Sequence, residues 1–243
     1  MRGMRSLPRL IAVGVVAAAV SPDVPVRAAG RQDVTVGIVL GGPAPARARL
    51  VPAIVAEADR IWRPRGVRIV SVARPSVTPD DVRITLTFTS LKSAVRPLNG
   101  RRGAATTGLG SIWFDEEDAP GDTISVDDEA VAARIAEVKV SNRPMDEWPP
   151  AVIDQVMGRA LGRVLAHELG HYLLRSKAHQ TSGLMRAAFS GSDLASWART
   201  RFVLDSNMLP RLRANLARIE LLKDPAVAAN RQRAASPASD VDR

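Results

Sequence analysis

Residues 151–174 read AVIDQVMGRALGRVLAHELGHYLL and contain no proline. Apolar residues recur along this stretch at helical spacing. Pro149 and Pro150 precede it, and proline is tolerated in a first helical turn because its missing N–H has no partner there. The sequence therefore predicts one long helix over residues 151–174.

Small residues recur at every fourth position of this helix, at Gly158, Gly162, Ala166 and Gly170. A glycine weakens a helix by up to about 1 kcal/mol relative to alanine, so repeated glycines on one face need a compensating reason. Close packing of another element against this face is such a reason. Chance spacing in a chain rich in Gly and Ala is the alternative.

His167, Glu168 and His171 lie near the end of the predicted helix. Histidines four residues apart lie on one face, so both imidazoles can reach one ion, and zinc accepts neutral imidazole nitrogen. Glu168 is rotated by about 100° from His167, so it can act on a nearby water without binding the ion. The spacing predicts one catalytic Zn²⁺, with Glu168 as the general base. A solvent-facing histidine pair on an amphipathic helix is the alternative.

A catalytic zinc site uses three protein ligands. All three histidines of the chain fall between residues 167 and 179, which makes His179 the expected third ligand. Asp193 is the reserve candidate and Asp205 a weaker one. An exposed loop histidine is the alternative reading of His179.

Residues 167–185, HELGHYLLRSKAHQTSGLM, resemble a zincin and in particular a metzincin-type peptidase. In that clan a third histidine follows the helix, and a methionine in a tight turn lies beneath the metal. His179 and Met185 match those positions. The clan places a glycine and the third ligand three and six residues after the second histidine, where this chain has Leu174 and Lys177, so its turn must be longer.

The resemblance implies a fold, a substrate and two further roles. The fold is α+β and zincin-like, with a mixed twisted sheet, a backing helix, a long active-site helix and a small, mainly helical C-terminal part. The substrate is a peptide or protein, bound in a groove beside an edge strand, for which Gly110–Phe114 is the candidate. Tyr172 is a candidate for holding the oxyanion, with packing as its other interpretation.

Alternating or β-branched apolar residues predict the remaining elements. Strands are expected over residues 34–40, 67–72, 81–90, 110–114 and 122–126. Helices are expected over 46–63, 127–137 and 209–222. The stretch 91–109 is rich in Gly, Arg and Thr and is predicted as an exposed loop.

The two ends of the chain have distinct compositions. Three arginines precede the apolar run Leu10–Val20, which is shorter than the roughly 20 residues that span a bilayer, and small residues follow it. We predict a signal peptide at 1–28 and a secreted or periplasmic protein, with a buried N-terminal helix as the alternative. The expected domains are a zincin-like catalytic domain at 29–190, its helical C-terminal part at 191–223 and a disordered tail at 224–243.

Composition excludes several classes of protein. The 243 residues include no cysteine, so disulfides, thiol catalysis and cysteine metal sites are excluded. Aromatic residues make up 4%, which predicts a core of Val, Ile, Leu and Ala. The net charge is +9, but the arginines are dispersed without interleaved aromatics, so we expect no nucleic-acid partner. No second apolar stretch approaches bilayer length, so no stable membrane insertion is expected after signal cleavage.

These features favour a secreted zinc-dependent peptidase. A zinc amidase acting on cell-wall peptide keeps the metal chemistry and changes the bond. A non-catalytic, zinc-stabilised binding protein is the third hypothesis. Glu168 argues against this last one, because a purely structural zinc site requires no general base.

Overall fold

The structure is a computed structural model that describes residues 33–42, 48–72, 82–89, 105–106, 108–139 and 142–223. The predicted signal peptide at 1–28 and the predicted disordered tail at 224–243 lie outside the described residues, as does most of the predicted loop at 91–109. Within the described ranges, no helix combines the length and the apolar character that crossing a membrane requires.

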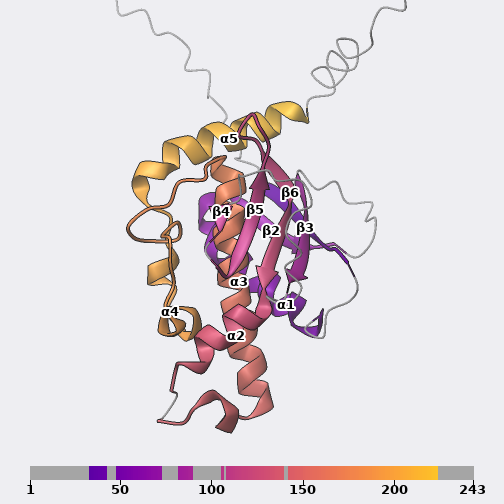
Figure 1. Ribbon diagram of the computed structural model, residues 1–243. Coiled ribbons are helices and arrows are strands. Elements are labelled where there is room, and N and C mark those ends of the chain that lie inside the picture. Colours follow the sequence, from indigo (N-terminus) through magenta and orange to yellow (C-terminus); the bar gives the residue numbers. More distant parts are fainter. Residues whose placement is uncertain are drawn as a thin grey trace, which may run out of the picture. The chain divides into compact units, whose positions relative to one another are not determined.

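A mixed sheet of six strands forms the centre of the described fold, in the order β2-β1-β3-β6-β5-β4 (Figure 1). The strands are β1 (Val34–Leu40), β2 (Val67–Ser71), β3 (Val82–Thr89), β4 (Ala105–Thr106), β5 (Gly110–Phe114) and β6 (Pro120–Asp127). The first four in this order pair in parallel, whereas β5 pairs antiparallel with both β6 and β4. The predicted mixed sheet is confirmed. The short strand β4 corrects the prediction of a loop throughout 91–109.

The central strands bury one apolar face. In β3, Val82, Ile84 and Leu86 are buried whereas Arg83 between them is exposed. Neighbouring side chains of a strand point to opposite faces, so this alternation turns every apolar residue to the same side. Ile84 lies in register with Ile38 of β1, and both residues belong to the hydrophobic core.

Two helices pack against this core. α1 (Val51–Trp62) contacts β2, α3 (Pro150–Leu174) contacts β5 and β6, and the two helices pack against each other (Figure 1). Each has a proline in its first turn, where the missing N–H costs nothing. The helix predicted over 46–63 is shorter than expected, because its flanks form the 3₁₀ turns Ala48–Leu50 and Arg63–Arg65.

α1 packs on the face of α3 that carries the small residues Gly158, Gly162 and Ala166. A Cβ atom at Gly158 would lie 2.8 Å from the Cβ of Ala53, and one at Gly162 would lie 2.6 Å from the carbonyl oxygen of Ile54. The indole N–H of Trp62 donates to the carbonyl of Ala166 at 2.9 Å. The predicted close approach of another element to this face is confirmed.

The remaining helices follow the sheet and α3. α2 (Asp128–Ala136) begins at Asp127, whose carboxylate accepts from the N–H of Ala130 at 2.8 Å. Residues 191–223 contain α4 (Gly191–Ala195), the 3₁₀ turns Thr200–Phe202 and Ser206–Met208, and α5 (Leu209–Leu222). α4 is too short for an apolar period to reveal it in the sequence. α5 lies where a helix was predicted.

Candidate metal centre

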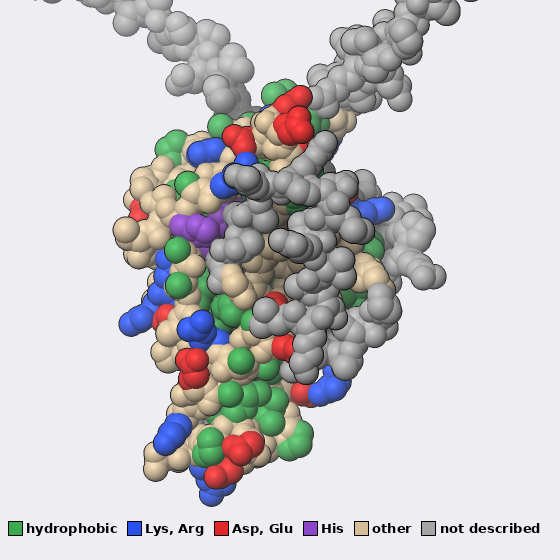
Figure 2. Space-filling view, viewed as in Figure 1, with side chains coloured by type: hydrophobic (Ala, Val, Ile, Leu, Met, Phe, Trp, Pro, Cys, Tyr) green, Lys and Arg blue, Asp and Glu red, His purple; other side chains and the backbone are tan. Residues whose placement is uncertain are grey.

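The structure brings the chain's three histidines together. His167 and His171 lie one turn apart on α3, and His179 lies on the segment that follows it. One ligand atom from each can be chosen so that all three lie within 4.8 Å of one another. In Figure 2 the histidine side chains gather at one place on the molecule.

Backbone carbonyls set the tautomers of the two helix histidines. Nδ1 of His167 lies 2.7 Å from the carbonyl oxygen of Leu184, and Nδ1 of His171 lies 2.6 Å from that of Ser176. A carbonyl oxygen only accepts, so each Nδ1 carries the hydrogen and donates it. Each neutral ring then has a bare lone pair on Nε2, which is the tautomer that a metal ligand needs.

The two Nε2 atoms lie 3.1 Å apart. Two lone pairs that face each other at this distance repel unless a cation shares them. Two nitrogens bound tetrahedrally to zinc at 2.0–2.1 Å lie about 3.4 Å apart. The observed pair is close to that separation, so the donors fit a zinc ion.

His179, on the segment that follows α3, completes the cluster. Its ring stacks on that of His167 with centroids 5.3 Å apart, and stands edge-on to that of His171 at 4.9 Å. Its Nε2 atom is buried and has no hydrogen-bond partner among the described residues. A buried nitrogen of this kind is costly unless something binds it, so His179 also fits the ion.

Burial keeps the helix histidines neutral. It lowers the pKa of His167 to about 3 and that of His171 to about 4, and the hydrogen bonds to Leu184 and Ser176 only partly oppose this. Burial also lowers the pKa of His179. At neutral pH the three rings therefore present uncharged nitrogens, the form that binds metal.

A sharp chain reversal carries the backbone from α3 to His179. Arg175 adopts a left-handed conformation, with φ of 47°, and ends the helix. Its carbonyl and that of Leu174 accept from the guanidinium of Arg211 on α5, each at 2.6 Å. The last carbonyls of the helix are thereby satisfied, and Ser176 is placed against His171.

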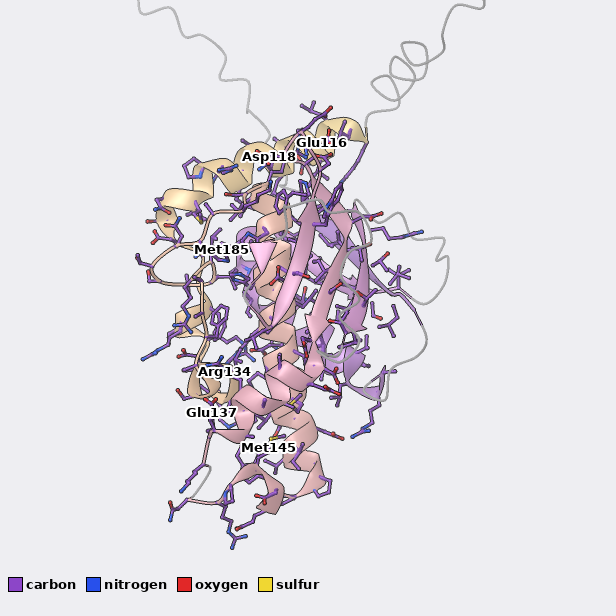
Figure 3. The ribbon with its side chains drawn as sticks, viewed as in Figure 1. Glu116, Asp118, Arg134, Glu137, Met145 and Met185 are labelled. Carbon is purple, nitrogen blue, oxygen red and sulfur yellow. The ribbon has the colours of Figure 1, made fainter. Side chains whose placement is uncertain are left out.

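Met185 lies beside α3 (Figure 3), with its sulfur against Gly170. It is buried, and a Cβ atom at Gly170 would overlap its sulfur. Position 170, between the two helix histidines, therefore has to be glycine for Met185 to lie there. The preceding residue, Leu184, holds His167 through its carbonyl.

Glu168 is buried beneath the start of β5. A Cβ atom at Gly110 would lie 2.9 Å from a carboxylate oxygen of Glu168 and 2.8 Å from a methyl of Val164. The lack of a side chain at Gly110 thus lets β5 pass directly beside the carboxylate.

The prediction of β5 as the edge strand needs a correction. β4 lies outside it, with Ala105 opposite Ile112 and Thr106 opposite Ser111. On this side β4 pairs with only Ser111 and Ile112 of β5. Trp113 and Phe114 therefore have no partner on this side among the described strands. The two-residue strand has no sequence period that could have predicted it.

The two reserve ligands lie outside the histidine cluster. The carboxylate of Asp193 pairs with Arg186 at 2.7 Å and with Arg201 at 2.9 Å. Asp205 caps a 3₁₀ turn by accepting from the N–H of Asn207. Tyr172 packs partly buried against the hydrophobic core, and burial raises its pKa.

Aromatic and arginine side chains behind the cluster were not predicted. Phe189 stands edge-on to His167 at 5.4 Å and stacks on Phe202 at 5.1 Å. The guanidinium of Arg163 lies 4.5 Å from the Phe202 ring, and that of Arg186 lies 4.6 Å from Phe189. Arg163 is four residues before His167, and an arginine within so apolar a helix is a signal that could have revealed this layer.

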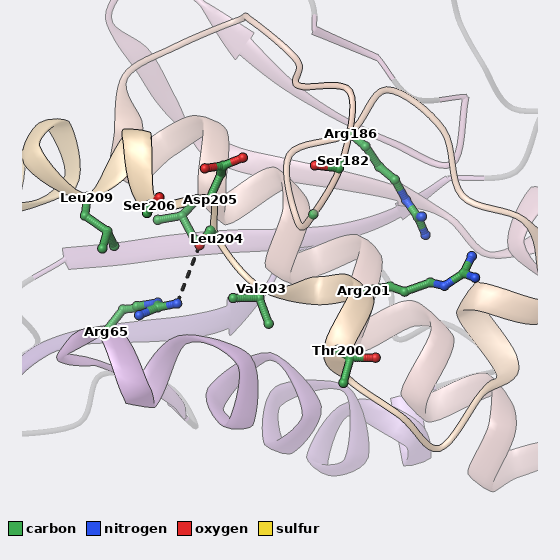
Figure 4. A pocket seen from close by; sticks show the side chains of 11 residues that line it. Arg65, Ser182, Arg186, Thr200, Arg201, Val203, Leu204, Asp205, Ser206 and Leu209 are labelled. Atoms are coloured by element: carbon green, nitrogen blue, oxygen red, sulfur yellow. Dashed lines mark hydrogen bonds between the residues drawn. The ribbon is translucent and has the colours of Figure 1, made fainter.

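A hollow of about 630 Å³ is lined in part by Ser182 and Gly183, the residues that precede Leu184 (Figure 4). The N–H of Leu184 donates to the carbonyl of Val203 in its wall, at 2.9 Å. The three histidines do not line this hollow, so it is separate from the metal centre. Its lining includes Arg65, Ser182, Arg186, Arg201, Leu204 and Leu209.

No known protein family matches the sequence, and neither does any curated protein. Among solved structures, the chain is similar to the crystal structure of archaemetzincin from Methanopyrus kandleri. The TM-score is 0.39 and the sequence identity 14%, over 78% of this chain and 98% of that one.

Proposed function

We propose that this protein is a zinc-dependent peptidase with a zincin-like catalytic domain. His167, His171 and His179 hold one Zn²⁺, and Glu168 is the general base. One observation carries the proposal. Two buried imidazoles, each fixed by a backbone carbonyl, direct bare Nε2 atoms at each other across 3.1 Å.

Zinc bound at these nitrogens would act as a Lewis acid on water and on the substrate carbonyl. Glu168 follows His167 directly on α3 and is not part of the histidine cluster, and we place its carboxylate within reach of the attacking water. One of its oxygens takes the proton of the attacking water and then delivers it to the nitrogen of the leaving amine. Burial beside Val164 and Gly110 holds the carboxylate in one place for both transfers.

An extended peptide is the substrate that suits this geometry. β5 passes beside Glu168, and an extended chain can bind a strand through its backbone groups. Because β4 covers the first half of β5, we place the substrate along Trp113 and Phe114. Trp113 is 43% exposed and offers an apolar surface for a substrate side chain.

Export is part of the same proposal. The arginines and the apolar run Leu10–Val20 form a signal peptide at 1–28, which makes the protein secreted or periplasmic. We assign 29–190 to the catalytic domain and 191–223 to its C-terminal part. In a chain without cysteine, bound metal would contribute stability that disulfides often provide outside the cell.

The test combines metal content with cleavage. Zinc is quantified in the purified protein and in Glu168→Gln, and both are incubated with a diverse peptide library. We expect one zinc per chain in each protein, and cleavage by the unaltered protein alone. Zinc below one ion per ten chains after zinc supplementation would overturn the metal site. Cleavage by Glu168→Gln at the unaltered rate would overturn the mechanism.

Two outcomes would favour the other hypotheses. Hydrolysis confined to the amide bonds of cell-wall peptide, and dependent on Glu168, would indicate the amidase. Stoichiometric zinc without turnover on either class of substrate would indicate the non-catalytic binding protein.

A further inference from the structure

The exposed side of α1 carries two adjoining hollows that the proposed peptidase chemistry does not use. Their volumes are about 660 Å³ and about 210 Å³, and both are lined by Ala56, Arg60 and Arg199. The larger continues to Arg63 and the smaller to Trp197. We call this surface the α1 groove.

Trp197 forms one end of the groove and is 68% exposed. The guanidinium of Arg159 lies 3.7 Å from the centre of its ring, and the same arginine donates to the carbonyl of Ala195 at 2.5 Å. The indole is therefore held in place on one side by a nearly buried arginine.

The groove has more positive than negative charge. Two carboxylates, Glu57 and Asp59, lie among four arginines that line it, namely Arg60, Arg63, Arg159 and Arg199. Glu57 faces two of them, at 2.7 Å from Arg199 and 3.7 Å from Arg60. The lining therefore has an excess of two positive charges, which an anionic partner would balance.

Arg60 and Arg63 are the most accessible of these cations, with side chains 60% and 61% exposed. Arg60 is held only loosely, at 3.7 Å from Glu57. Arg60 can therefore turn toward a partner, whereas Arg63 is paired at 2.6 Å with the largely buried Asp59. Ala53 and Ala56 form the low floor between them and Trp197.

We propose that the α1 groove binds an acidic peptide segment of a partner protein. A rigid, exposed tryptophan ringed by arginines has the composition of an interface hot spot, because these two residue types most often dominate binding energy between proteins. The charge excess selects Asp and Glu in the segment. A single aromatic provides no ladder for successive nucleic-acid bases, and a concave groove does not suit a flat bilayer.

The test measures binding directly, with the full chain. The probe is a fluorescein-labelled peptide of ten residues in which Asp and Glu alternate with Leu and Phe. Its binding is measured by fluorescence anisotropy at low salt. The matched peptide has Asn and Gln in place of the acids. We expect saturable binding of the acidic peptide and at least about tenfold weaker binding of the amide peptide, because the charge excess supplies much of the attraction.

Variants locate the site. Trp197→Ala should weaken binding about tenfold or more, as loss of a hot-spot aromatic does, and Arg60→Gln about threefold. The matched controls are Leu221→Ala, an apolar residue of α5 that is 62% exposed, and Arg213→Gln, an exposed arginine of the same helix; both should bind as the unaltered protein does. Circular dichroism melting checks that each variant is folded.

Several results would overturn the proposal. These are equal binding of the two peptides, unaltered binding by folded Trp197→Ala, or tighter binding of a thymidine decanucleotide or of phosphatidylglycerol vesicles than of the acidic peptide. Glu168→Gln should bind the peptide normally. Peptide binding and zinc-dependent cleavage can therefore fail independently.

Discussion

His179 is the residue on which the choice of zinc ligands depends. The sequence left Asp193 as a reserve candidate, whereas the structure places the Asp193 carboxylate between Arg186 and Arg201. Only His179 joins the helix histidines in a group that could hold a metal ion, among the residues that the structure describes. With His179 as the proposed third ligand, the Asp193 carboxylate has a structural role as the partner of Arg186 and Arg201.

Replacing His179 should therefore affect zinc far more than replacing Asp193. His179→Ala should lower zinc affinity by more than about 100-fold, since loss of an outer-shell partner alone costs roughly 10–100-fold. Asp193→Asn should bind zinc normally and unfold at a lower temperature, because Arg186 then lies buried beside a neutral partner. Competition with a chromophoric chelator measures the affinity. Equal losses in the two variants would contradict the assignment.

Gly170 is needed for packing, although glycine weakens the helix. Its hydrogen faces the sulfur of Met185, so Gly170→Ala should destabilise the protein by about 1–3 kcal/mol, as overpacking does, despite the better helix propensity of alanine. Gly121→Ala is the control, since its nearest neighbour would lie 3.4 Å away. Urea denaturation measures both. Met185→Ala should lower the free energy of unfolding less in the Gly170→Ala background than in the unaltered protein, because it removes the overlap with the alanine methyl.

At the scale of elements, α3 joins the metal centre to the C-terminal part. Arg163, one turn before His167, is fully buried and donates to Glu57 of α1 at 3.2 Å and to the carbonyl of Ala198 at 3.0 Å. It also donates to the carbonyls of Asp193 and Leu194. One side chain thus fixes α1, α3 and the segment after α4 relative to one another.

Arg163→Met should destabilise the protein by about 3–5 kcal/mol, because Glu57 loses a buried partner and backbone carbonyls of the α4 segment lose a donor. Arg49→Met removes a solvent-exposed pair with Asp154 and should leave the urea midpoint unchanged. A double variant with Glu57→Gln should lose less than the two single losses added together. If Arg163→Met unfolds at the same urea concentration as Arg49→Met, the hydrogen bonds of Arg163 do not stabilise the protein.

At the scale of the whole molecule, the buried histidines make the metal-free protein sensitive to acid. Their folded pKa values, about 3 for His167 and about 4 for His171, lie below the unfolded value of 6.5. Between these values the unfolded chain binds protons that the folded chain does not. Stability is therefore complete above pH 6.5 and falls as the pH is lowered toward 4, by up to about 1.4 kcal/mol per pH unit for each histidine.

Urea denaturation in chelator at pH 7.5, 6.5 and 5.5 measures this loss. His167→Gln, which keeps an N–H donor for the carbonyl of Leu184, should show a smaller difference between pH 6.5 and 5.5. Saturating zinc should raise stability throughout this range, because the ion binds only the folded arrangement. An unchanged pH dependence in His167→Gln would show that the acid sensitivity lies elsewhere.

The local elements and the helix face of the site are predictable from the sequence alone. Helical spacing placed His167 and His171 on one side of α3, and small residues at every fourth position predicted the close approach of another element, which the structure identifies as α1. Such features depend on residues a few positions apart, which a helix or strand period relates directly.

Contacts between residues far apart in the sequence are set by the three-dimensional fold. It brought His179, not Asp193, to the helix histidines and placed β4 outside β5. It also buried Glu57 beside Arg163, 106 residues away. A loop has no period, and the partner of a buried charge is set by how helices pack, so no local pattern carries this information.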